Sequence, residues 1–542
     1  MRRAVRKINL SNFFGILVSI LKPKYNAVPT NLGLGTAFPA SGAVVLTKFL
    51  TMGPPKMQTL NSKMLRFLGI ALMVLASSGI VSAGTWTKLT NQPTFQTDTA
   101  LLLTDGTVMV HQYNSGTWWK LTPTEEGSYA NGTWTELASM QSGYAPLYFA
   151  SAVLPDGRVL VEGGEYNNLQ GVETNLGDIY DPTTNVWTTV NPPTGWSTIG
   201  DSPAVVLPNG TFMMGQGGQP SRLQVLFNAS TLTWTATGTG KADGFSEEGF
   251  ALVPSGEVLT VDCEDGTNSE LYNPTTSSWS SAGSTIVPLP NNGGMGIVPE
   301  MGPLVQRPDG TVVAFGATTN TSVYSPTAAK WTAGPVFPNG DDIADGPGAL
   351  LPDGNILVYT SPGVFEGTGT FYEFTSGNTF VEEPNTSSGS ALESWQARLL
   401  VLPTGQVMYI PADGRHIDIE LYTGTGTVNN AWRPTLTAGP RTVTRGDSYT
   451  VSGRQLNGLS AGATYGDDAQ MASNFPLVVI RNNATKHFFF ARTTNFSTMG
   501  IATGNAVVSA TFTVSTATET GPSTFYVVAN GIPSAGHSIT VQ

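Results

Sequence analysis

The sequence predicts an all-β protein built from seven repeated units that are followed by a smaller β-domain. A short apolar run meets a two-residue polar–Gly turn and a second apolar run seven times along the chain. An aromatic residue follows each turn after roughly 25 residues, so the aromatics recur at steps of roughly 50 residues. Gly accounts for 62 of 542 residues and charged residues for only 12%, which favours many turns and few charged helices.

The repeated turns share a polar residue followed by glycine. They are Asp105-Gly106, Asp156-Gly157, Asn209-Gly210, Ser255-Gly256, Asp309-Gly310, Asp353-Gly354 and Thr404-Gly405. The aromatics that follow them are Trp134, Trp187, Trp234, Trp279, Trp331, Phe380 and Trp432. A two-residue turn between apolar runs predicts a β-hairpin, because a positive φ at the turn matches the twist of the strands. A period near 50 residues is typical of a kelch-type blade, so we expect a seven-bladed β-propeller.

The second unit shows the expected order of strands within one blade. A first strand ends at Leu154, and the hairpin leads into a second strand over residues 158–162. Tyr180 and Trp187 mark the two outer strands, and their spacing recurs in later units. Trp86 lies one period before Trp134, so either the strand of Trp86 or that of Trp432 completes the seventh unit.

The period breaks after Trp432. Residues 434–542 alternate apolar and polar positions between Gly, Asn and Ser turns, as in Thr524-Phe525-Tyr526-Val527-Val528. This pattern is typical of a small immunoglobulin-like β-sandwich. We therefore expect a leader over residues 1–83, a propeller over residues 84–433 and a sandwich over residues 434–542.

The leader resembles an export signal preceded by an over-extended translation start. Lys63 and Arg66 precede an apolar stretch over residues 67–75, and the small residues Val81-Ser82-Ala83 follow. The apolar stretch is shorter than the roughly 20 residues that span a bilayer. We expect cleavage after Ala83, no stable membrane insertion afterwards, and an extracellular or periplasmic protein.

The charge balance and the cysteine count exclude several classes of function. Residues 1–83 hold ten Lys or Arg and no Asp or Glu, so the remainder carries 16 basic and 38 acidic residues. A net charge of −22 over that remainder repels phosphate backbones, so we expect no nucleic-acid partner. The single cysteine, Cys263, excludes an intramolecular disulfide and a multi-cysteine metal cluster.

The order of the units and the end of the chain resemble the galactose oxidase family. The resemblance is carried by the repeated units and by Gly521-Pro522-Ser523-Thr524-Phe525-Tyr526-Val527-Val528-Ala529-Asn530-Gly531-Ile532-Pro533-Ser534, and it covers roughly residues 84–542. It implies a kelch propeller capped by a sandwich. In the active oxidases of that family it also implies one copper ion held by two tyrosines and two histidines, with one tyrosine cross-linked to a cysteine.

This chain departs from that ligand set at every position. The adjacent Tyr-His pair falls on Trp395-Gln396, the cross-linked tyrosine on Asp201, the cysteine on Ala150, and the last histidine on Phe496. None of the four histidines, His111, His416, His487 and His537, stands at a ligand position. We therefore expect no copper and no radical-copper oxidase chemistry.

Carboxylates stand where the first strand of most units begins. Counting back from each hairpin glycine reaches Asp98, Asp201, Glu247 with Glu248, Glu300, Asp345 and Gln396, which follows Trp395. Convergent carboxylates repel one another unless a cation, water or protonation relieves them. Hard oxygen ligands suit Ca²⁺, and Asp201, Glu248, Glu300 and Asp345 are the candidate ligands. Solvation of these acids at a channel mouth is the alternative.

The sequence leaves three classes of function open and assigns no catalytic residue. The favoured class is a secreted recognition protein whose partner is a carbohydrate, an envelope component or a protein. The second is a carbohydrate-active enzyme that uses the acidic residues, with or without Ca²⁺. The third is a structural or adhesion protein. The fold alone does not choose among them, because propellers host unrelated activities.

Overall fold

The computed structural model describes residues 83–218, 221–264, 266–291, 299–468 and 471–542. These residues form strands and loops, which confirms the predicted all-β class. The helices of the described part are short 3-10 turns: η1 (Pro338–Gly340), η2 (Gly389–Ala391), η3 (Ser394–Gln396) and η4 (Asn430–Trp432). None of the described helices is both long and apolar enough to cross a membrane. The predicted leader lies outside the described residues except for Ala83.

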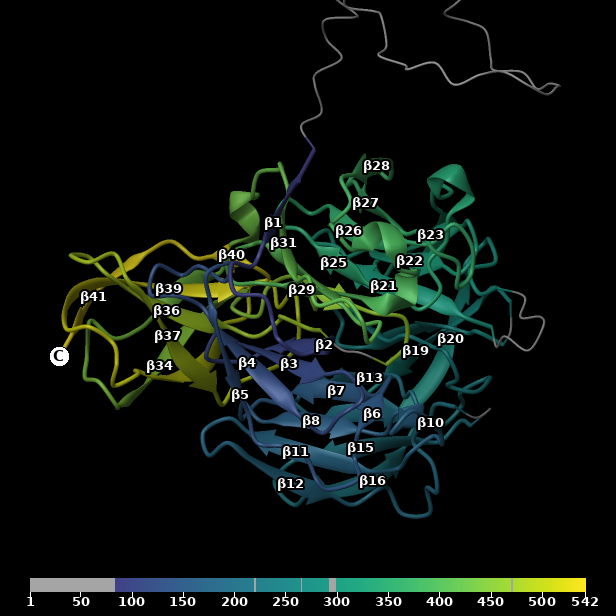
Figure 1. Cartoon of the computed structure of the whole chain (residues 1–542), viewed down its shortest axis with the longest axis horizontal. Helices are drawn as coiled ribbons and strands as arrows, with labels where there is room; N and C mark the ends of the chain where they lie inside the picture. Colours follow the sequence, from purple (N-terminus) through teal and green to yellow (C-terminus); the bar gives the residue numbers. More distant parts are fainter. Residues whose placement is uncertain (1–82, 219–220, 265, 292–298, 469–470) are drawn as a thin grey trace, which may run out of the picture. The chain divides into compact units, whose positions relative to one another are not determined.

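Seven antiparallel sheets carry the repeated units, and most of their strands are labelled in Figure 1. The first three sheets are β2 (Thr97–Leu102), β3 (Val108–Gln112), β4 (Trp118–Thr122) and β5 (Thr133–Glu136); β7 (Ala150–Val153), β8 (Val159–Glu162), β11 (Gly177–Asp181) and β12 (Val186–Val190); and β13 (Ala204–Val206), β14 (Phe212–Gly215), β15 (Gln224–Asn228) and β16 (Thr233–Thr237). The next two are β17 (Ala251–Leu252), β18 (Val258–Val261), β19 (Asn268–Asn273) and β20 (Ser278–Ser284); and β21 (Met301–Gln306), β22 (Val312–Gly316), β23 (Thr321–Ser325) and β24 (Lys330–Ala333).

The last two repeated sheets each recruit a strand from outside their own unit. The sixth contains β25 (Gly348–Leu350), β26 (Ile356–Thr360), β27 (Thr370–Phe374), β28 (Phe380–Glu383) and, from the C-terminal region, β35 (Ala463–Thr464). The seventh contains β29 (Ala397–Val401), β30 (Val407–Pro411), β31 (Glu420–Thr423) and β1 (Thr85–Lys88). Trp86 of β1 pairs with Tyr422 of β31, so the strand of Trp86 completes the seventh sheet. Trp432 lies in η4 instead.

The seven sheets repeat one register between their two outer strands. The residue pairs are Leu121–Trp134, Tyr180–Trp187, Phe227–Trp234, Tyr272–Trp279, Tyr324–Trp331, Phe374–Phe380 and Tyr422–Trp86. Each pair places a large side chain next to an aromatic ring across two strands, where aromatic pairs stabilise a sheet. The periodic aromatics of the sequence are therefore packing residues of the sheets.

The repeated hairpins contain one residue more than the two-residue turn expected from the sequence. In the second sheet the Leu154 N–H donates to the Arg158 carbonyl and the Gly157 N–H donates to the Leu154 carbonyl. This pattern encloses a three-residue loop in which glycine takes a positive φ, a common way to join two twisted strands. Gly157 has a φ of 83°. The polar residue before the glycine stabilises the loop, because Asp156 Oδ1 accepts the Arg158 N–H.

The first strand of each repeated sheet is more buried than the last strand of the same sheet. All six residues of β2 and of β21 are buried, whereas β5 and β24 are mostly exposed. The first strands also contact one another: β2 contacts β7, β7 contacts β13, β17 contacts β21, β21 contacts β25 and β25 contacts β29. Apart from the step between β13 and β17, these contacts follow the chain order and return to β2 through β29. The first strands therefore converge.

The C-terminal residues form a separate nine-stranded sheet with its own core. Its strands are β32 (Thr435–Ala438), β33 (Thr442–Val443), β34 (Ser448–Arg454), β36 (Leu477–Asn482), β37 (Phe488–Thr494), β38 (Val508–Thr513), β39 (Gly521–Ala529), β40 (Ile532–Pro533) and β41 (His537–Val541). Alternate residues such as Val451, Ile480 and Phe512 fill this core. Residues 82–542 nevertheless form one compact unit. The boundary between residues 433 and 434 stays a prediction.

Candidate cation and ligand pocket

A pocket of about 550 Å³ lies where loops before the first strands meet a loop of the C-terminal region. Its lining combines two kinds of side chain. The acidic residues are Glu165, Asp201, Glu247, Glu300, Asp345, Asp467 and Asp468. The apolar and aromatic residues are Tyr113, Leu147, Tyr148, Tyr166, Leu169, Phe365, Trp395 and Tyr465. Pockets that combine apolar walls with a few convergent polar groups are the usual form of a ligand site.

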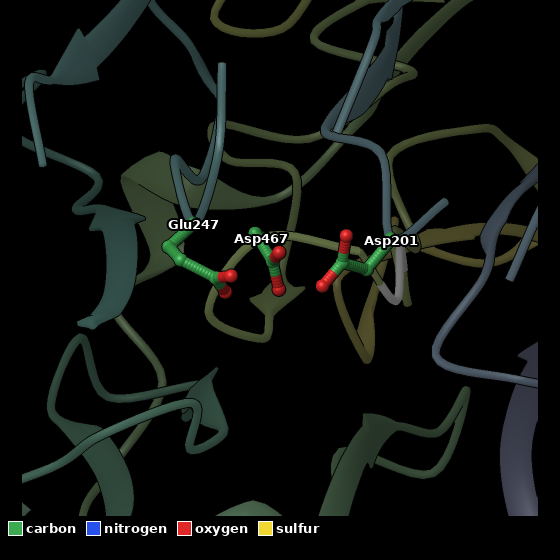
Figure 2. Close-up of side chains that lie close together, drawn as sticks. All are labelled: Asp201, Glu247 and Asp467. Atoms are coloured by element: carbon green, nitrogen blue, oxygen red, sulfur yellow. The ribbon is translucent and has the colours of Figure 1, made fainter. Parts of the chain in front are cut away.

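Five of the carboxyl groups form two overlapping triads. Oxygens of Asp201, Glu247 and Asp467 all lie within 4.8 Å of one another, and so do oxygens of Glu247, Glu300 and Asp345. Figure 2 shows the first triad, in which the carboxyl groups of Glu247 and Asp201 turn toward that of Asp467 between them. Three oxygens at this spacing can share one Ca²⁺ ion, because Ca–O distances are about 2.3–2.6 Å.

The loop before each first strand fixes the direction of its carboxylate. Glu247 has a φ of 58°, a left-handed conformation that a non-glycine residue adopts only where its surroundings impose it. The Cys263 Sγ–H donates to the Glu247 carbonyl at 2.8 Å and holds this conformation. Asp345 has a φ of 48°, and its N–H donates to the Met301 carbonyl at 3.2 Å. The buried Cys263 thiol therefore has a structural role in placing an acidic residue.

The C-terminal region supplies Asp467 and Asp468 through a loop that begins at β35. Thr464 of β35 pairs with Gly348 of β25, which anchors the loop at the edge of the sixth sheet. Gly466 then passes so close to Asp345 that an added β-carbon would lie 2.7 Å from the Asp345 Oδ1 atom. The Asp467 Oδ1 atom accepts the Asp468 N–H at 2.8 Å.

Sequence reasoning missed Asp467 and Asp468 because they belong to no repeated unit. In the family that the sequence resembles, the C-terminal region supplies the last copper ligand, and the matching position here is Phe496. That ring instead stacks on Phe475, with centroids 6.1 Å apart, and packs against the apolar cores. The adjacent acidic pair beside glycine in Tyr465-Gly466-Asp467-Asp468 was the available signal.

Burial and mutual repulsion raise the pKa of every carboxyl group in the two triads. Burial is the larger cause, followed by the neighbouring carboxylates. Burial, then Asp345, raises the pKa of Glu300 to about 10, and burial, then Asp468, raises that of Asp345 to about 7. The pKa values of Asp201, Glu247 and Asp467 are raised well above the ordinary range. The site therefore favours protons or other cations over bare carboxylates.

Asp98 does not line the pocket, although the sequence placed it with the other acids. Its Oδ2 atom lies 2.9 Å from His111 Nδ1, and its Oδ1 atom lies 3.6 Å from Arg398 Nη2. The Arg398 guanidinium is fully buried and lies 4.0 Å from the ring centroid of Tyr465, which lines the pocket. Asp98 is thus paired with His111 and Arg398, and Arg398 also packs on the Tyr465 ring of the pocket wall.

Glu248 does not face the pocket either, and Glu247 takes the place expected for it. The Glu248 Oε1 atom lies 3.0 Å from Lys241 Nζ, and its Oε2 atom accepts the Thr260 hydroxyl. The left-handed turn at Glu247, with its φ of 58°, separates the directions of the two side chains, and only Glu247 lines the pocket. As a candidate cation ligand, Glu248 is therefore replaced by Glu247.

Trp395 lines the pocket, whereas Gln396 turns back into its own loop. The Gln396 Oε1 atom accepts the Glu393 N–H at 3.1 Å as part of a capping box around η3. The Trp395 indole meets Tyr148 and Phe365 edge to face, with ring centroids 6.0 and 6.3 Å apart. These three rings form an aromatic wall of the pocket.

The donor set of the pocket does not fit the copper centre that the family resemblance implies. Its lining contains tyrosines but neither histidine nor cysteine. Three histidines pair with carboxylates elsewhere: His111 with Asp98, His416 with Asp413 and His487 with Glu519. Soft and imidazole ligands select copper, whereas carboxylate oxygens select Ca²⁺, Mg²⁺ or Mn²⁺. We therefore derive no copper chemistry for this chain.

Solved structures with a similar fold include two that are distant from this chain in sequence. One solved structure is titled "Novel fungal alcohol oxidase with catalytic diversity among the AA5 family, in complex with copper"; it is 13% identical, with a TM-score of 0.49, and covers 86% of this chain and 100% of its own. Another, "Structure of YjhT", is 15% identical, with a TM-score of 0.38, over 55% of this chain and 99% of its own. No protein-family model and no curated protein matches this chain. These likenesses assign neither a family nor an activity.

Proposed function

We propose that this protein binds carbohydrate in its central acidic pocket with the help of a divalent cation. In this proposal the seven repeated sheets are the blades of a β-propeller and the C-terminal sheet is an immunoglobulin-like sandwich. Three observations support the propeller. The seven sheets share one register, their last strands are less buried than their first strands, and β29 contacts β2. The loops around the converging first strands would then form the walls of the site.

The observation that carries the proposal is the pairing of buried carboxylates with an aromatic wall in one pocket. A sugar ring has apolar C–H faces and a rim of hydroxyl groups. The C–H faces can pack on Trp395, Tyr148 or Phe365, which present large rigid surfaces. The hydroxyl groups can donate to carboxylates or coordinate a cation held by them. A pocket of about 550 Å³ accommodates a small-molecule ligand of this size.

The test is a glycan array probed with the purified chain in Ca²⁺ and again in EDTA, followed by calorimetry with each glycan retained. We expect retention that is lost or strongly weakened in EDTA. Trp395→Ala should abolish it. Leu169 and Leu223 provide a matched pair, because both are half-exposed and only Leu169 lines the pocket. Leu169→Ala should weaken binding while Leu223→Ala leaves it unchanged. Retention of no glycan under either condition would refute the proposal.

A second candidate, carbohydrate hydrolysis, is favoured by Glu165. This half-buried carboxyl group lines the pocket but belongs to neither triad. Burial, followed by repulsion from Glu173, raises the pKa of Glu165 to about 7. A carboxyl group with a pKa near neutrality suits general acid catalysis of glycosidic bond cleavage. Release of reducing sugar from a bound glycan, lost in Glu165→Gln with binding retained, would select this candidate.

We also propose that the chain is exported and that the mature protein begins at Gly84. The Gly84 N–H donates to the Glu383 Oε2 atom at 2.6 Å, and Glu383 is buried. Cleavage after Ala83 would turn this amide into an α-ammonium group that faces a carboxylate, which strengthens the interaction. Sequencing the N-terminus of secreted protein tests the proposal. A mature chain that begins before Met57 would contradict it.

A further inference from the structure

We propose that the central pocket is a two-cation centre in which the Glu247 carboxylate bridges two hard divalent cations. The inference rests on the proposed cation dependence of the pocket and goes beyond it by assigning a second ion. One ion would be held by Asp201, Glu247 and Asp467. The other would be held by Glu247, Glu300 and Asp345.

The geometry carries this assignment because the two triads share one carboxyl group. Each triad brings its oxygens within 4.8 Å of one another. That spacing is the upper limit for two oxygens on opposite sides of an ion with Ca–O distances of about 2.4 Å. A carboxylate has two oxygens, so Glu247 can give one to each ion. Ions bridged in this way lie about 3.5–4 Å apart in known two-metal sites.

Unpartnered oxygens on both sides of Glu247 point independently to missing ligands. Asp201 Oδ1 and Asp467 Oδ2 have no hydrogen-bond partner among the described residues, and both side chains line the pocket. In the other triad, Glu300 Oε2 also has no hydrogen-bond partner among the described residues, and its side chain also lines the pocket. Asp201 is 7% exposed, and Glu300 and Asp467 are each 3% exposed. Buried polar atoms without a partner are rare, and a bound ion is one of their explanations.

The charge count favours two ions over one. The two triads contain five carboxylates, and Asp468 and Glu165 add two more to the lining of the same pocket. A single divalent cation would leave at least three of the five ligand charges uncompensated in a buried site. Two divalent cations would leave one.

A third carboxylate triad in the described residues is not assigned a metal ion. Asp243, Glu248 and Asp262 also bring their oxygens within 4.8 Å of one another. The Lys241 ammonium occupies that cluster, with Nζ 3.0 Å from Glu248 and 3.6 Å from Asp262. The chain therefore supplies its own cation there. The Asp201 and Glu300 triads receive no lysine or arginine nitrogen within ion-pair distance in the described residues.

The test is the stoichiometry of Mn²⁺ or Ca²⁺ bound to the whole chain, measured by equilibrium dialysis with elemental analysis. We expect two ions per chain. In Mn²⁺-loaded protein the electron paramagnetic resonance spectrum should show spin–spin interaction between neighbouring ions rather than only the six-line signal of isolated ones. This first measurement needs no variant, so it stands even if a substitution prevents folding.

Variants then locate the two ions. Asp201→Asn and Glu300→Gln should each reduce the count from two to one, whereas Glu247→Gln should weaken both ions by tenfold or more. Asp309→Asn is the matched control, because Asp309 lies in a hairpin turn away from the pocket and should leave the count at two.

The outcomes separate this inference from the proposed function. One ion per chain, or two ions without magnetic interaction, overturns the two-cation centre and leaves cation-assisted sugar binding intact. No bound ion overturns the centre together with the cation dependence. Two interacting ions without retention of any glycan support the centre and refute the sugar proposal.

Discussion

Glu247 and Glu248 are adjacent in the chain but belong to two acidic clusters whose negative charge is compensated in different ways. Glu248 lies in a cluster of four carboxyl groups, Asp243, Glu248, Asp262 and Glu270, around the Lys241 ammonium. Glu247 lies in the central pocket, whose triads contain no basic side chain. One cluster is closed by a covalently attached cation. The other is open to a cavity of about 550 Å³.

The comparison indicates which cluster is structural and which can bind a ligand. Lys241 is 6% exposed, and its Nζ atom also lies 5.3 and 5.6 Å from the ring centroids of Phe245 and Trp279. An ammonium enclosed by carboxylates and aromatic faces cannot exchange with solvent ions. The pocket carboxylates face open space, so their compensation has to come from outside the chain.

Removing the built-in cation should have the largest effect. Lys241→Met leaves four buried carboxyl groups without their ammonium, and breaking a buried ion pair on one side costs about 3–5 kcal/mol. We expect the free energy of unfolding, measured by urea denaturation, to fall by that amount. The exposed Lys330→Met is the control and should change it by less than about 0.5 kcal/mol. A loss for Lys241→Met as small as that of the control would show that the cluster is already protonated.

Supplying the external cation should have the next largest effect. Ca²⁺ at 100 times its dissociation constant should stabilise the fold by about 2.7 kcal/mol, if it binds the folded state alone. Thermal unfolding of one sample in Ca²⁺ and in EDTA measures the shift. Glu247→Gln should reduce the shift, because Glu247 belongs to both triads. Equal midpoints in Ca²⁺ and EDTA would mean that protons, rather than metal ions, compensate the pocket.

These two clusters also show how far the sequence could predict the molecule. The all-β class followed from the turn and aromatic period, and the structure confirms it. The hairpin period also predicted that four acidic residues stand at the start of first strands. All four line one pocket: Asp201, Glu247, Glu300 and Asp345. Period alone could not separate Glu247 from Glu248, because a one-residue difference in backbone direction decides which side chain faces the pocket.

Other parts of the site depend on contacts that no local pattern encodes. Asp467 reaches the pocket because β35 pairs with β25, a contact across more than a hundred residues of sequence. Asp98 is absent from the lining because His111 and Arg398 bind it, and their positions depend on β3 and β29. The Lys241 cluster has no sequence motif, because Asp262 and Glu270 come from the region of β18 and β19, further along the chain than Asp243 and Glu248. Such juxtapositions follow from tertiary packing rather than from spacing.

Glu162 on β8 provides a third case, a buried carboxyl group with neither an ammonium nor a cavity. It is fully buried, and neither of its oxygens has a hydrogen-bond partner in the described part of the chain. Burial, followed by repulsion from Asp178 on β11, raises its pKa well above 4.5, and the Tyr144 ring also lies near it. The folded state therefore keeps the proton that the unfolded chain releases above about pH 4.5.

The sign of the pH dependence follows from that raised pKa. The stability associated with protonated Glu162 is fully present below the unfolded pKa and is lost as pH rises toward the folded pKa. Glu162→Gln removes this loss, so the variant should gain about 1–3 kcal/mol relative to the parent between pH 4 and pH 8. Urea denaturation at both pH values measures the difference. A parent-to-variant difference that does not change with pH would place an unseen partner at Glu162.

A surface pair of the same two chemical groups should show the smallest effect and gives the scale for Lys241. Lys88 Nζ lies 3.6 Å from Asp418 Oδ1, and the two side chains are 51% and 38% exposed. Water solvates both partners, so a surface pair of this kind contributes only about 0–1 kcal/mol. A double-mutant cycle with Lys88→Ala and Asp418→Ala isolates the interaction free energy from the other effects of each substitution.

We expect the interaction free energy of the Lys88–Asp418 pair to shrink further in 1 M salt, because the Debye length falls to about 3 Å there. The loss in Lys241→Met should change far less with salt, because its partners are buried. If both losses fell equally with salt, the Lys241 cluster would be as accessible to solvent ions as the surface pair, and the distinction between a built-in and an external cation would fail.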